Sequence, residues 1–323
     1  LGNNYIDNNG TINIVNGTTI IENSVISLKN KGIIVKAGAI LKLVNSYIRL
    51  NELGHNFAIK VEAGGTLIVD GSTITNATKS SGSDAAYIMT DGGTIELKKA
   101  LIDNNKNGFD NGSQRQGNIV NVKNGVLKVE DSKITNNTTQ VPGAIGLTNS
   151  TATFSNTEFI SNKAAFGGAI NAKDSDVTIT DCKFEENTVN RRGGAISMEG
   201  GTLTIDDNST FNKNGFAGGT NESLGGALYL TDMSSVTIGK AQFNNNGLID
   251  EEYGFRTMDG GAIYLNNIPN ATFNGTQFKE NRVWGYNLGS GGAVYANGAS
   301  TVVNVNGAKF HDNYASIYGG GMS

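Results

Sequence analysis

Apolar residues alternate with polar residues over short stretches of the chain. Residues 177–180 (VTIT) and 203–205 (LTI) show this alternation, which is typical of strands that bury one face. No stretch shows the period of a helix. The pattern therefore predicts an all-β chain made of short strands.

Two tetrapeptides recur in a fixed order from residue 142 onward. Each unit opens with two small residues, alanine and an aliphatic residue, and closes with phenylalanine three residues before asparagine. The openings are PGAI at 142, GGAI at 167, GGAI at 193, GGAL at 225, GGAI at 260 and GGAV at 291. The closings are FISN at 159, FEEN at 184, FNKN at 211, FNNN at 243, FKEN at 278 and FHDN at 310.

The spacing of these motifs separates a constant half of the repeat from a variable half. The phenylalanine follows the opening by 17 to 19 residues, whereas the next opening follows the phenylalanine by 8 to 17 residues. A unit with short strands and no helix buries its inner faces by coiling and stacking on its copies. We therefore predict a single right-handed parallel β-helix of about eleven coils, about 50 Å long at ~4.8 Å per coil.

The first 141 residues fit the same register with weaker motifs. The core pair Ile170 and Val177 recurs as Val120 and Leu127. We treat residues 1–323 as one domain, with divergent coils in 1–141 and regular coils in 142–323. Because GGG at 319–321 stands where another unit would open, we expect the segment to belong to a longer protein. The phenylalanine position is occupied by Ile26, Ile48, Ile74, Ile102 and Ile134.

The recurring side chains are predicted to stack from coil to coil. The phenylalanines would form an internal aromatic ladder, each burial contributing about 1.5–3 kcal/mol. The asparagines suit a turn with left-handed backbone geometry, and their amides would bond as a ladder. The glycines of the opening provide a corner without side chains. The predicted ladder residues are Phe159, Phe184, Phe211, Phe243, Phe278, Phe310, Asn162, Asn187, Asn214, Asn246, Asn281 and Asn313.

The alternation of GGA[ILV] and FxxN over residues 142–323 resembles the repeats of the polymorphic outer-membrane protein family of β-helix adhesins. Residues 1–141 lack both motifs, so the resemblance there rests on register. The resemblance implies an extracellular, cell-surface module that contacts a host or neighbouring cell. Its partner would be a protein or glycan on that cell surface.

Composition narrows the functions that this fold could serve. The chain has 44 glycines, 2 prolines, 17% charged residues and a formal net charge of -4. A nucleic-acid-binding surface needs clustered Lys and Arg, so we expect no nucleic-acid partner. No apolar run reaches the roughly 18 residues of a membrane span, so we expect no direct membrane insertion by this segment. End-to-end association of two copies of this segment is a further possible partner interaction, because the end coils could stack on each other.

Parallel β-helices also include polysaccharide lyases and glycoside hydrolases, so an enzyme is an alternative. Acidic doublets occur at 185–186, 206–207 and 251–252, and we expect none to have an acidic counterpart stacked on the next coil. Arg191 and Arg192 are expected in a short loop, and Cys182 as a small buried residue. His55 and His311 lie far apart, without the spacing of a metal site. We therefore expect no catalytic residue, no metal and no other cofactor.

The best candidate for a binding site lies in three elaborated coils. Their long loops, residues 215–224, 247–259 and 282–290, come from consecutive coils, so we expect them to touch on one edge. Aromatic and arginine side chains on adjacent loops are typical of protein or glycan recognition. Stacked outward tyrosines are also typical of a plain surface ladder, and a structural stalk or filament would need no elaborated loops. The candidate ligand-binding residues are Phe216, Tyr253, Phe255, Arg256, Trp284, Tyr286, Tyr229, Tyr264 and Tyr295.

Overall fold

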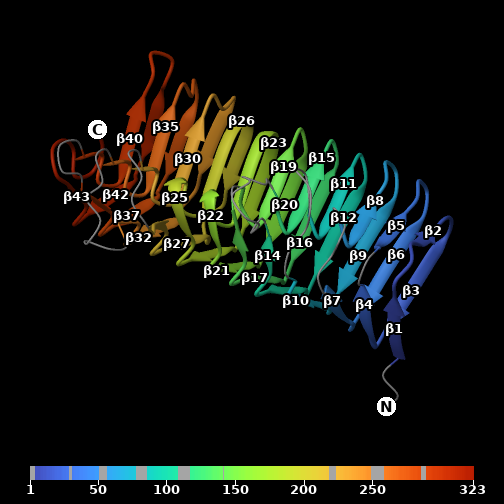
Figure 1. Cartoon of the computed structure of the whole chain (residues 1–323). Coiled ribbons are helices and arrows are strands. Elements are labelled where there is room, and N and C mark those ends of the chain that lie inside the picture. Colours follow the sequence, from blue (N-terminus) through green and yellow to red (C-terminus); the bar gives the residue numbers. More distant parts are fainter. Residues whose placement is uncertain are drawn as a thin grey trace.

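The chain winds into an elongated stack of coils, with strands of successive coils side by side (Figure 1). The computed structural model describes residues 4–28, 31–50, 57–77, 86–107, 117–140, 142–217, 223–248, 258–284 and 289–323. Neighbouring coils pair in parallel through three sheets, here named A, B and C. The predicted all-β fold with parallel, stacked strands is confirmed.

Sheet A is 12-stranded over the described residues and carries the phenylalanine ladder. Its strands are β1 (Asn4–Asn8), β4 (Ser24–Leu28), β7 (Tyr47–Leu50), β10 (Thr73–Thr75), β13 (Leu101–Asp103), β17 (Lys133–Thr135), β21 (Glu158–Ile160), β24 (Lys183–Glu185), β27 (Thr210–Asn212), β32 (Gln242–Asn244), β37 (Gln277–Lys279) and β42 (Lys309–His311).

Sheet B is 20-stranded over the described residues, because most coils contribute two strands to it. Its strands are β2 (Ile12–Ile14), β3 (Thr18–Glu22), β5 (Ile33–Val35), β6 (Ile40–Val44), β8 (Ile59–Val61), β9 (Thr66–Asp70), β11 (Ile88–Asp91), β12 (Thr94–Lys98), β15 (Val120–Lys123), β16 (Val126–Glu130), β19 (Ile145–Thr148), β20 (Thr151–Ser155), β23 (Ile170–Thr180), β26 (Ile196–Ile205), β30 (Leu228–Thr231), β31 (Ser235–Ile238), β35 (Ile263–Asn266), β36 (Ala271–Asn274), β40 (Val294–Asn297) and β41 (Val303–Asn306).

Sheet C is 11-stranded over the described residues and lies where the coil length varies. Its strands are β14 (Lys106–Asn107), β18 (Thr138–Thr139), β22 (Lys163–Phe166), β25 (Thr188–Arg192), β28 (Gly215–Phe216), β29 (Ser223–Leu224), β33 (Gly247–Leu248), β34 (Met258–Asp259), β38 (Arg282–Val283), β39 (Gly289–Ser290) and β43 (Tyr314–Ala315).

The predicted register between the divergent and the regular coils is confirmed. Ile134 of β17 pairs with Phe159 of β21, so isoleucine does take the phenylalanine position. Leu127 reaches Val177 through one intervening residue, Ala152, which pairs with both. One repeat therefore runs through the described residues from the first coils to the last.

The phenylalanines form the predicted internal aromatic ladder. Ring centroids of Phe159, Phe184, Phe211 and Phe243 follow one another at 4.6 Å with nearly parallel planes. The ladder continues through Phe278 to Phe310, at 5.3 and 4.9 Å. All but the half-buried Phe310 are at most 1% exposed. Each ring therefore contributes burial, and the four inner rings also pack on the rings of both neighbouring coils.

The asparagines form the predicted amide ladder, and Asn187 shows its geometry. Its Nδ2 donates to the carbonyl oxygen of Phe159 at 2.8 Å and to Oδ1 of Asn214 at 3.0 Å. Its Oδ1 accepts from the backbone N–H and the Nδ2 of Asn162, at 3.1 and 2.9 Å. Because Asn187 is fully buried, this amide is satisfied entirely by neighbouring coils.

The left-handed backbone geometry predicted for the ladder asparagine lies one residue earlier, which corrects that prediction. Ser161, Glu186, Lys213 and Glu280 have φ between 52° and 56°. A glutamate or lysine is rare in this region of backbone space. The turn therefore accepts varied side chains that point outward, and the asparagine is required for its amide alone.

In the five openings that begin with two glycines, the pair meets two different constraints. The first glycine has a positive φ, 64° at Gly193 and 68° at Gly225. The second glycine packs directly on the next coil, where a Cβ at Gly226 would overlap the carbonyl oxygen of Gly261. Only glycine fits both positions without strain. The alanine that follows is buried in each coil, as at Ala227.

A second internal ladder, made of hydroxyl groups, lies at the turn between sheets B and A. The backbone N–H of Ser46 donates to Oγ of Ser72 at 2.9 Å, and that of Cys182 donates to Oγ of Ser209 at 3.1 Å. Cys182 occupies a rung of this ladder and is 2% exposed, as predicted. Its burial raises the pKa of the thiol to about 11.

The phenylalanine ladder generates the first prediction. Phe211→Ala removes a fully buried ring between two others and should lower the free energy of unfolding by about 3–5 kcal/mol. Urea titration followed by circular dichroism measures this loss. Thr210→Ala, on the same strand but pointing outward, is the matched control and should change stability by less than about 0.5 kcal/mol. Equal effects of the two substitutions would place Phe211 outside the core.

The amide ladder generates the second prediction. Asn187→Ala removes the acceptor of the backbone N–H and the Nδ2 of Asn162 and the donor to the carbonyl oxygen of Phe159, at about 1–3 kcal/mol for each unsatisfied group. We expect a loss of at least about 2 kcal/mol in the same urea titration. Asn244→Ala, an asparagine of β32 outside the ladder, should be nearly neutral. A stable Asn187→Ala variant would show that the amide does not hold the coils.

The environment of Cys182 generates the third prediction. A thiol pKa of about 11 leaves on the order of one thiolate per several thousand thiols at pH 7.5. In the native protein the thiol of Cys182 should therefore not react for hours with an aromatic disulfide that releases a coloured thiolate. In guanidinium chloride the same thiol should react with one equivalent of the reagent. Rapid reaction of the folded protein would contradict the burial of the hydroxyl ladder.

Candidate functional site

The bases of the three elaborated loops lie on consecutive coils, as the sequence predicted. Strand β28 pairs with β33 and β33 with β38 where the loops leave sheet C. Strand β29 pairs with β34 and β34 with β39 where the loops return. These strands lie in the yellow-to-red part of the chain in Figure 1. The loops therefore begin and end within one strand spacing of each other.

Four of the predicted ligand-binding residues lie outside the described residues. These are Tyr253, Phe255, Arg256 and Tyr286. Their role in binding stays a prediction. The described part of the candidate site consists of the strands at the loop bases, the outward tyrosines of sheet B, and Trp284.

Phe216 is buried among the strands of sheet C rather than exposed, which corrects its predicted place. It is 1% exposed and packs in a small cluster with Val189, Met258 and Val283. This cluster is separate from the main core. Phe216 therefore supports the loop bases and is removed from the candidate contacts.

The outward tyrosines form a stack along the axis. Ring centroids of Tyr229 and Tyr264 lie 5.2 Å apart, and those of Tyr264 and Tyr295 lie 5.5 Å apart. Tyr264 is 9% exposed, and burial raises the pKa of its phenol and that of Tyr295. The rings cover each other's faces, so the stack offers edges and hydroxyl groups to a ligand and not an open aromatic platform.

Arg191 and Arg192 lie at the end of strand β25, not in a loop as predicted. The guanidinium carbon of Arg191 lies 5.6 Å from the ring centroid of Phe166. That of Arg192 lies 5.1 Å from the centroid of Tyr229, and its Nη1 donates to the tyrosine hydroxyl at 3.2 Å. Each arginine is therefore held against an aromatic ring of a neighbouring coil.

Trp284 is the most exposed aromatic residue of the loop bases. It is 56% exposed and stacks on Tyr314, which is 44% exposed, with centroids 5.7 Å apart. The sequence analysis did not identify Tyr314. The signal was present, because Tyr314 follows Phe310 by four residues as Arg282 follows Phe278, and the register pairs Arg282 with Tyr314.

The acidic residues are held mainly by neighbouring lysines and amides. Glu185 bonds with Lys183 at 2.6 Å, and this hydrogen bond lowers the pKa of its carboxyl group. Asp206 accepts from the backbone N–H of Asp181 at 3.1 Å. Asp181 belongs to the preceding coil, whereas the next coil places Lys240 beside the doublet at 206–207. The doublet at 251–252 lies outside the described residues. Asp207 pairs with Lys240 at 3.1 Å, and its pKa is lowered by hydrogen bonds from that residue.

No group of three or more His, Cys, Asp or Glu side chains suited to a metal occurs among the described residues. The described ranges likewise contain no helix with the length and apolarity needed to cross a membrane.

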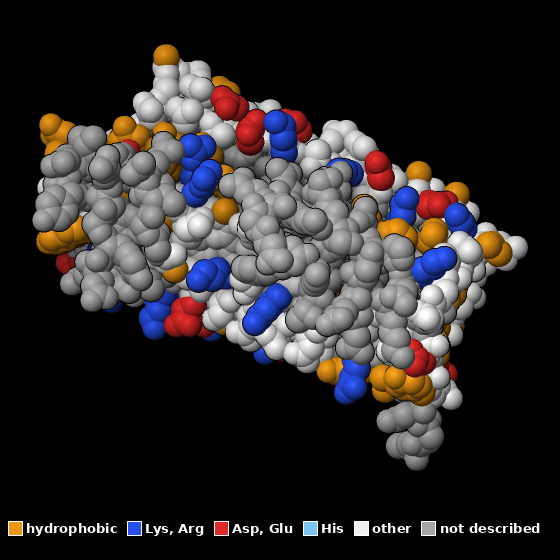
Figure 2. All heavy atoms as spheres, in the orientation of Figure 1, with side chains coloured by type: hydrophobic (Ala, Val, Ile, Leu, Met, Phe, Trp, Pro, Cys, Tyr) orange, Lys and Arg blue, Asp and Glu red, His pale blue; other side chains and the backbone are white. Residues whose placement is uncertain are grey.

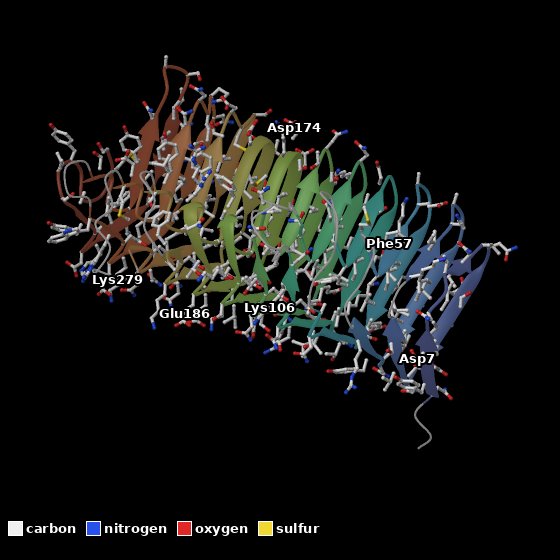
Figure 3. All side chains as sticks on the ribbon, in the orientation of Figure 1. Asp7, Phe57, Lys106, Asp174, Glu186 and Lys279 are labelled. Atoms are coloured by element: carbon white, nitrogen blue, oxygen red, sulfur yellow. The ribbon has the colours of Figure 1, made fainter. Side chains whose placement is uncertain are left out.

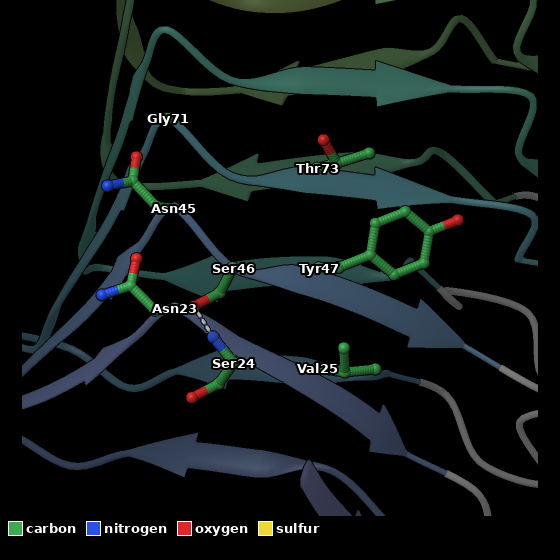
Figure 4. A pocket seen from close by; sticks show the side chains of 8 residues that line it. All are labelled: Asn23, Ser24, Val25, Asn45, Ser46, Tyr47, Gly71 and Thr73. Atoms are coloured by element: carbon green, nitrogen blue, oxygen red, sulfur yellow. Dashed lines mark hydrogen bonds between the residues drawn. The ribbon is translucent and has the colours of Figure 1, made fainter. Parts of the chain in front are cut away.

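A shallow hollow of about 300 Å³ lies on the turn between sheets B and A in the first coils (Figure 4). It follows the repeated turn, and its floor includes the hydrogen bond from the N–H of Ser24 to Oγ of Ser46 at 3.3 Å. It contains amides and hydroxyls but no carboxylate, histidine or lysine, so it lacks the groups of a catalytic site. Its lining residues are Asn23, Ser24, Val25, Asn45, Ser46, Tyr47, Gly71 and Thr73.

Comparison with known proteins agrees with this geometry. No protein among the curated sequences matches the chain significantly. Residues 118–323, more than half of the chain, match the model of the family described as "Right handed beta helix region". The match includes all three elaborated coils and the regular repeat. The chain therefore belongs to the right-handed β-helix family.

Proposed function

We propose that this β-helix is an extracellular adhesion module that binds a protein or glycan on another cell surface through the loop edge of sheet C. In this proposal the segment acts by binding and not by catalysis. The repeat motifs support an adhesin of the polymorphic outer-membrane protein type, with which they share the GGA[ILV] and FxxN order.

The observation that carries the proposal is the exposed pair of Trp284 and Tyr314 beside three stacked loop bases. Large rings that already stack on each other have little rotamer freedom left to lose when a partner covers them. Aromatic residues of this kind dominate the binding energy of many interfaces. A plain stalk would have no reason to expose them.

The scaffold beneath the pair supports the same conclusion. The separate cluster of Val189, Phe216, Met258 and Val283 fixes the strands from which the loops leave. Rigid coils that carry variable loops are a common arrangement for recognition, because loop length on one edge does not disturb the stacking.

The fourth prediction tests this function directly. Trp284→Ala combined with Tyr314→Ala should reduce attachment of protein-coated beads to host or neighbouring cells at least roughly tenfold, because the exposed anchors are removed. The unfolding temperature should change little, since both side chains are about half exposed. Tyr5→Ala, which removes a 62% exposed tyrosine from the first coil, is the matched control and should leave attachment intact.

Two outcomes would count against the proposed function. Full attachment of the folded double variant would remove this pair from the binding site and favour the stalk alternative. Equal losses in the double variant and in Tyr5→Ala would show that attachment depends on exposed aromatics in general and not on the loop edge.

A further inference from the structure

One column of outward residues follows the turn between sheets B and A. The backbone N–H of Asn23 donates to the residue before Asn45, and that of Asn45 donates to the residue before Gly71. All three residues are exposed and have φ between 44° and 58°. They therefore occupy equivalent positions on successive coils and differ only in their side chains. The hollow of Figure 4 lies over these three positions.

The polar groups of this column have different partners in the first coils and in the later ones. Further along, Nδ2 of Asn156 donates to Oδ1 of Asp131 at 2.6 Å. In the first coils, the side-chain amides of Asn23 and Asn45 form no hydrogen bond with another described residue. Gly71 has no side chain to offer them, and a Cβ there would lie 2.5 Å from Oδ1 of Asn45. The hollow therefore has two amides on its wall whose donors and acceptors are available to a ligand.

The outward side chains of sheet A form the opposite wall of the hollow. Val25 of β4, Tyr47 of β7 and Thr73 of β10 occupy one column, because Tyr47 pairs with both of the others. All three are half-buried. The guanidinium carbon of Arg49 lies 5.4 Å from the ring centroid of Tyr47 and helps to hold the ring. Figure 4 shows this ring across from the two amides.

The floor of the hollow is part of the hydroxyl ladder. The backbone N–H of Ser24 donates to Oγ of Ser46 at 3.3 Å, and that of Ser46 donates to Oγ of Ser72 at 2.9 Å. These serines are at most 5% exposed. The backbone that carries both walls is therefore fixed before a ligand arrives, which lowers the entropy lost on binding.

The described lining of the hollow is uncharged, unlike later parts of sheet A. The column of Tyr47 continues to Lys133 and Glu158, which form an ion pair at 2.9 Å. Hydrophobic side chains reach the lower edge of the molecule near the first coils, and charged ones lie on this edge nearer the middle of the stack (Figure 2). In Figure 3, Asp7 marks the first coils on this edge, and Glu186 lies further along it. The neutral surface is thus local to the hollow.

We propose that this hollow binds one uncharged sugar residue, a hexose unit of a glycan. A side-chain amide both donates and accepts, so it matches the neighbouring hydroxyl groups of a sugar. The ring of Tyr47 and the methyl groups of Val25 suit the apolar C–H face of a pyranose. A volume of about 300 Å³ is at the lower end of small-molecule sites, which favours a single sugar residue.

Other ligands suit these walls less well. An anion needs a cation as its partner and a metal ion needs carboxylate ligands, and the described lining provides neither. An extended peptide would need an unpaired strand edge, whereas β4, β7 and β10 each pair with a strand on both sides. The hollow lies near the first coils, and Trp284 lies near the last ones (Figure 1). The proposal therefore does not depend on the proposed adhesion function.

The test is a titration of the isotopically labelled full chain, followed by nuclear magnetic resonance. The probes are the methyl glycosides of glucose, galactose and mannose. At least one of them should shift the side-chain amide signals of Asn23 and Asn45, with a Kd in the millimolar range expected of so small a ligand. The single variants Asn23→Gly and Asn45→Gly assign these signals by their disappearance. Unchanged amide signals with all of the glycosides would overturn the proposal.

The variant Asn23→Gly combined with Asn45→Gly should raise the Kd about tenfold, because the hydrogen bonds of two amides are lost. Glycine adopts the positive φ of both positions without strain, so the fold should be kept. Saturation transfer from the protein to the glycoside measures the Kd of each variant. Asn156→Gly, at a φ of 43° in the same column, is the matched control and should leave the Kd unchanged. Equal weakening by this control would contradict the site.

A second variant fills the hollow instead of removing its amides. Gly71→Asn introduces a side chain at a φ that asparagine tolerates, and it should abolish glycoside binding while the unfolding temperature changes little. Full binding by the folded Gly71→Asn variant would overturn the site. The charged sugars glucuronate and glucosamine are titrated in parallel. Tighter binding of either one than of every neutral glycoside would overturn the choice of an uncharged sugar.

Discussion

The buried amide of the asparagine ladder is the interaction on which the stacking of the coils depends. Each ladder asparagine bonds to the coil before it and the coil after it, as Asn187 does with Asn162 and Asn214. The stacked phenylalanines supply more burial, but ring packing has little directional preference along the axis. A shift of one residue would leave the amide donors and acceptors unpaired at a cost that burial does not offset. The amides therefore fix the register, and the rings stabilise the stack that results.

A register fixed at one corner of the coil leaves the opposite side free to vary. At the turn beside the ladder, the residue before each asparagine has left-handed backbone geometry. At the start of the next unit, the first glycine of the GGA motif has it too. Between these two points the chain passes through sheet C, where insertions of different length leave from β28 and return at β29 without disturbing either ladder. Loop length therefore varies on sheet C, while strand length and register stay constant on sheets A and B, because the asparagine ladder fixes the register at one corner of the coil.

The sequence predicted the fold and register well because ladder residues repeat in identity as well as in spacing. Phenylalanine, asparagine and Gly-Gly-Ala each occupy one column, so their order gives the coil path directly. The hydroxyl ladder was missed because its column mixes residue types. Besides Ser46, Ser72, Cys182 and Ser209 it holds Ala100, Ser132 and Thr157, which share a small size and not one identity. The burial of Phe216 was missed for a different reason. It depends on Met258, which returns from a loop more than thirty residues later, and no local pattern reports such a contact.

The distribution of charge shows why a solenoid has to be interpreted by column. In a globular domain, net charge is a fair guide to the potential around the molecule. In a stack of coils each outward position repeats at the strand spacing, so one column collects charge of one sign while another balances it. Lys133 faces Glu158 across adjacent coils of sheet A, whereas Lys106 and Lys163 face threonines on sheet C. Interactions between exposed charges fade over roughly 8–10 Å at physiological salt. The potential beside one column of outward residues therefore depends on the charges of that column far more than on the net charge of the chain.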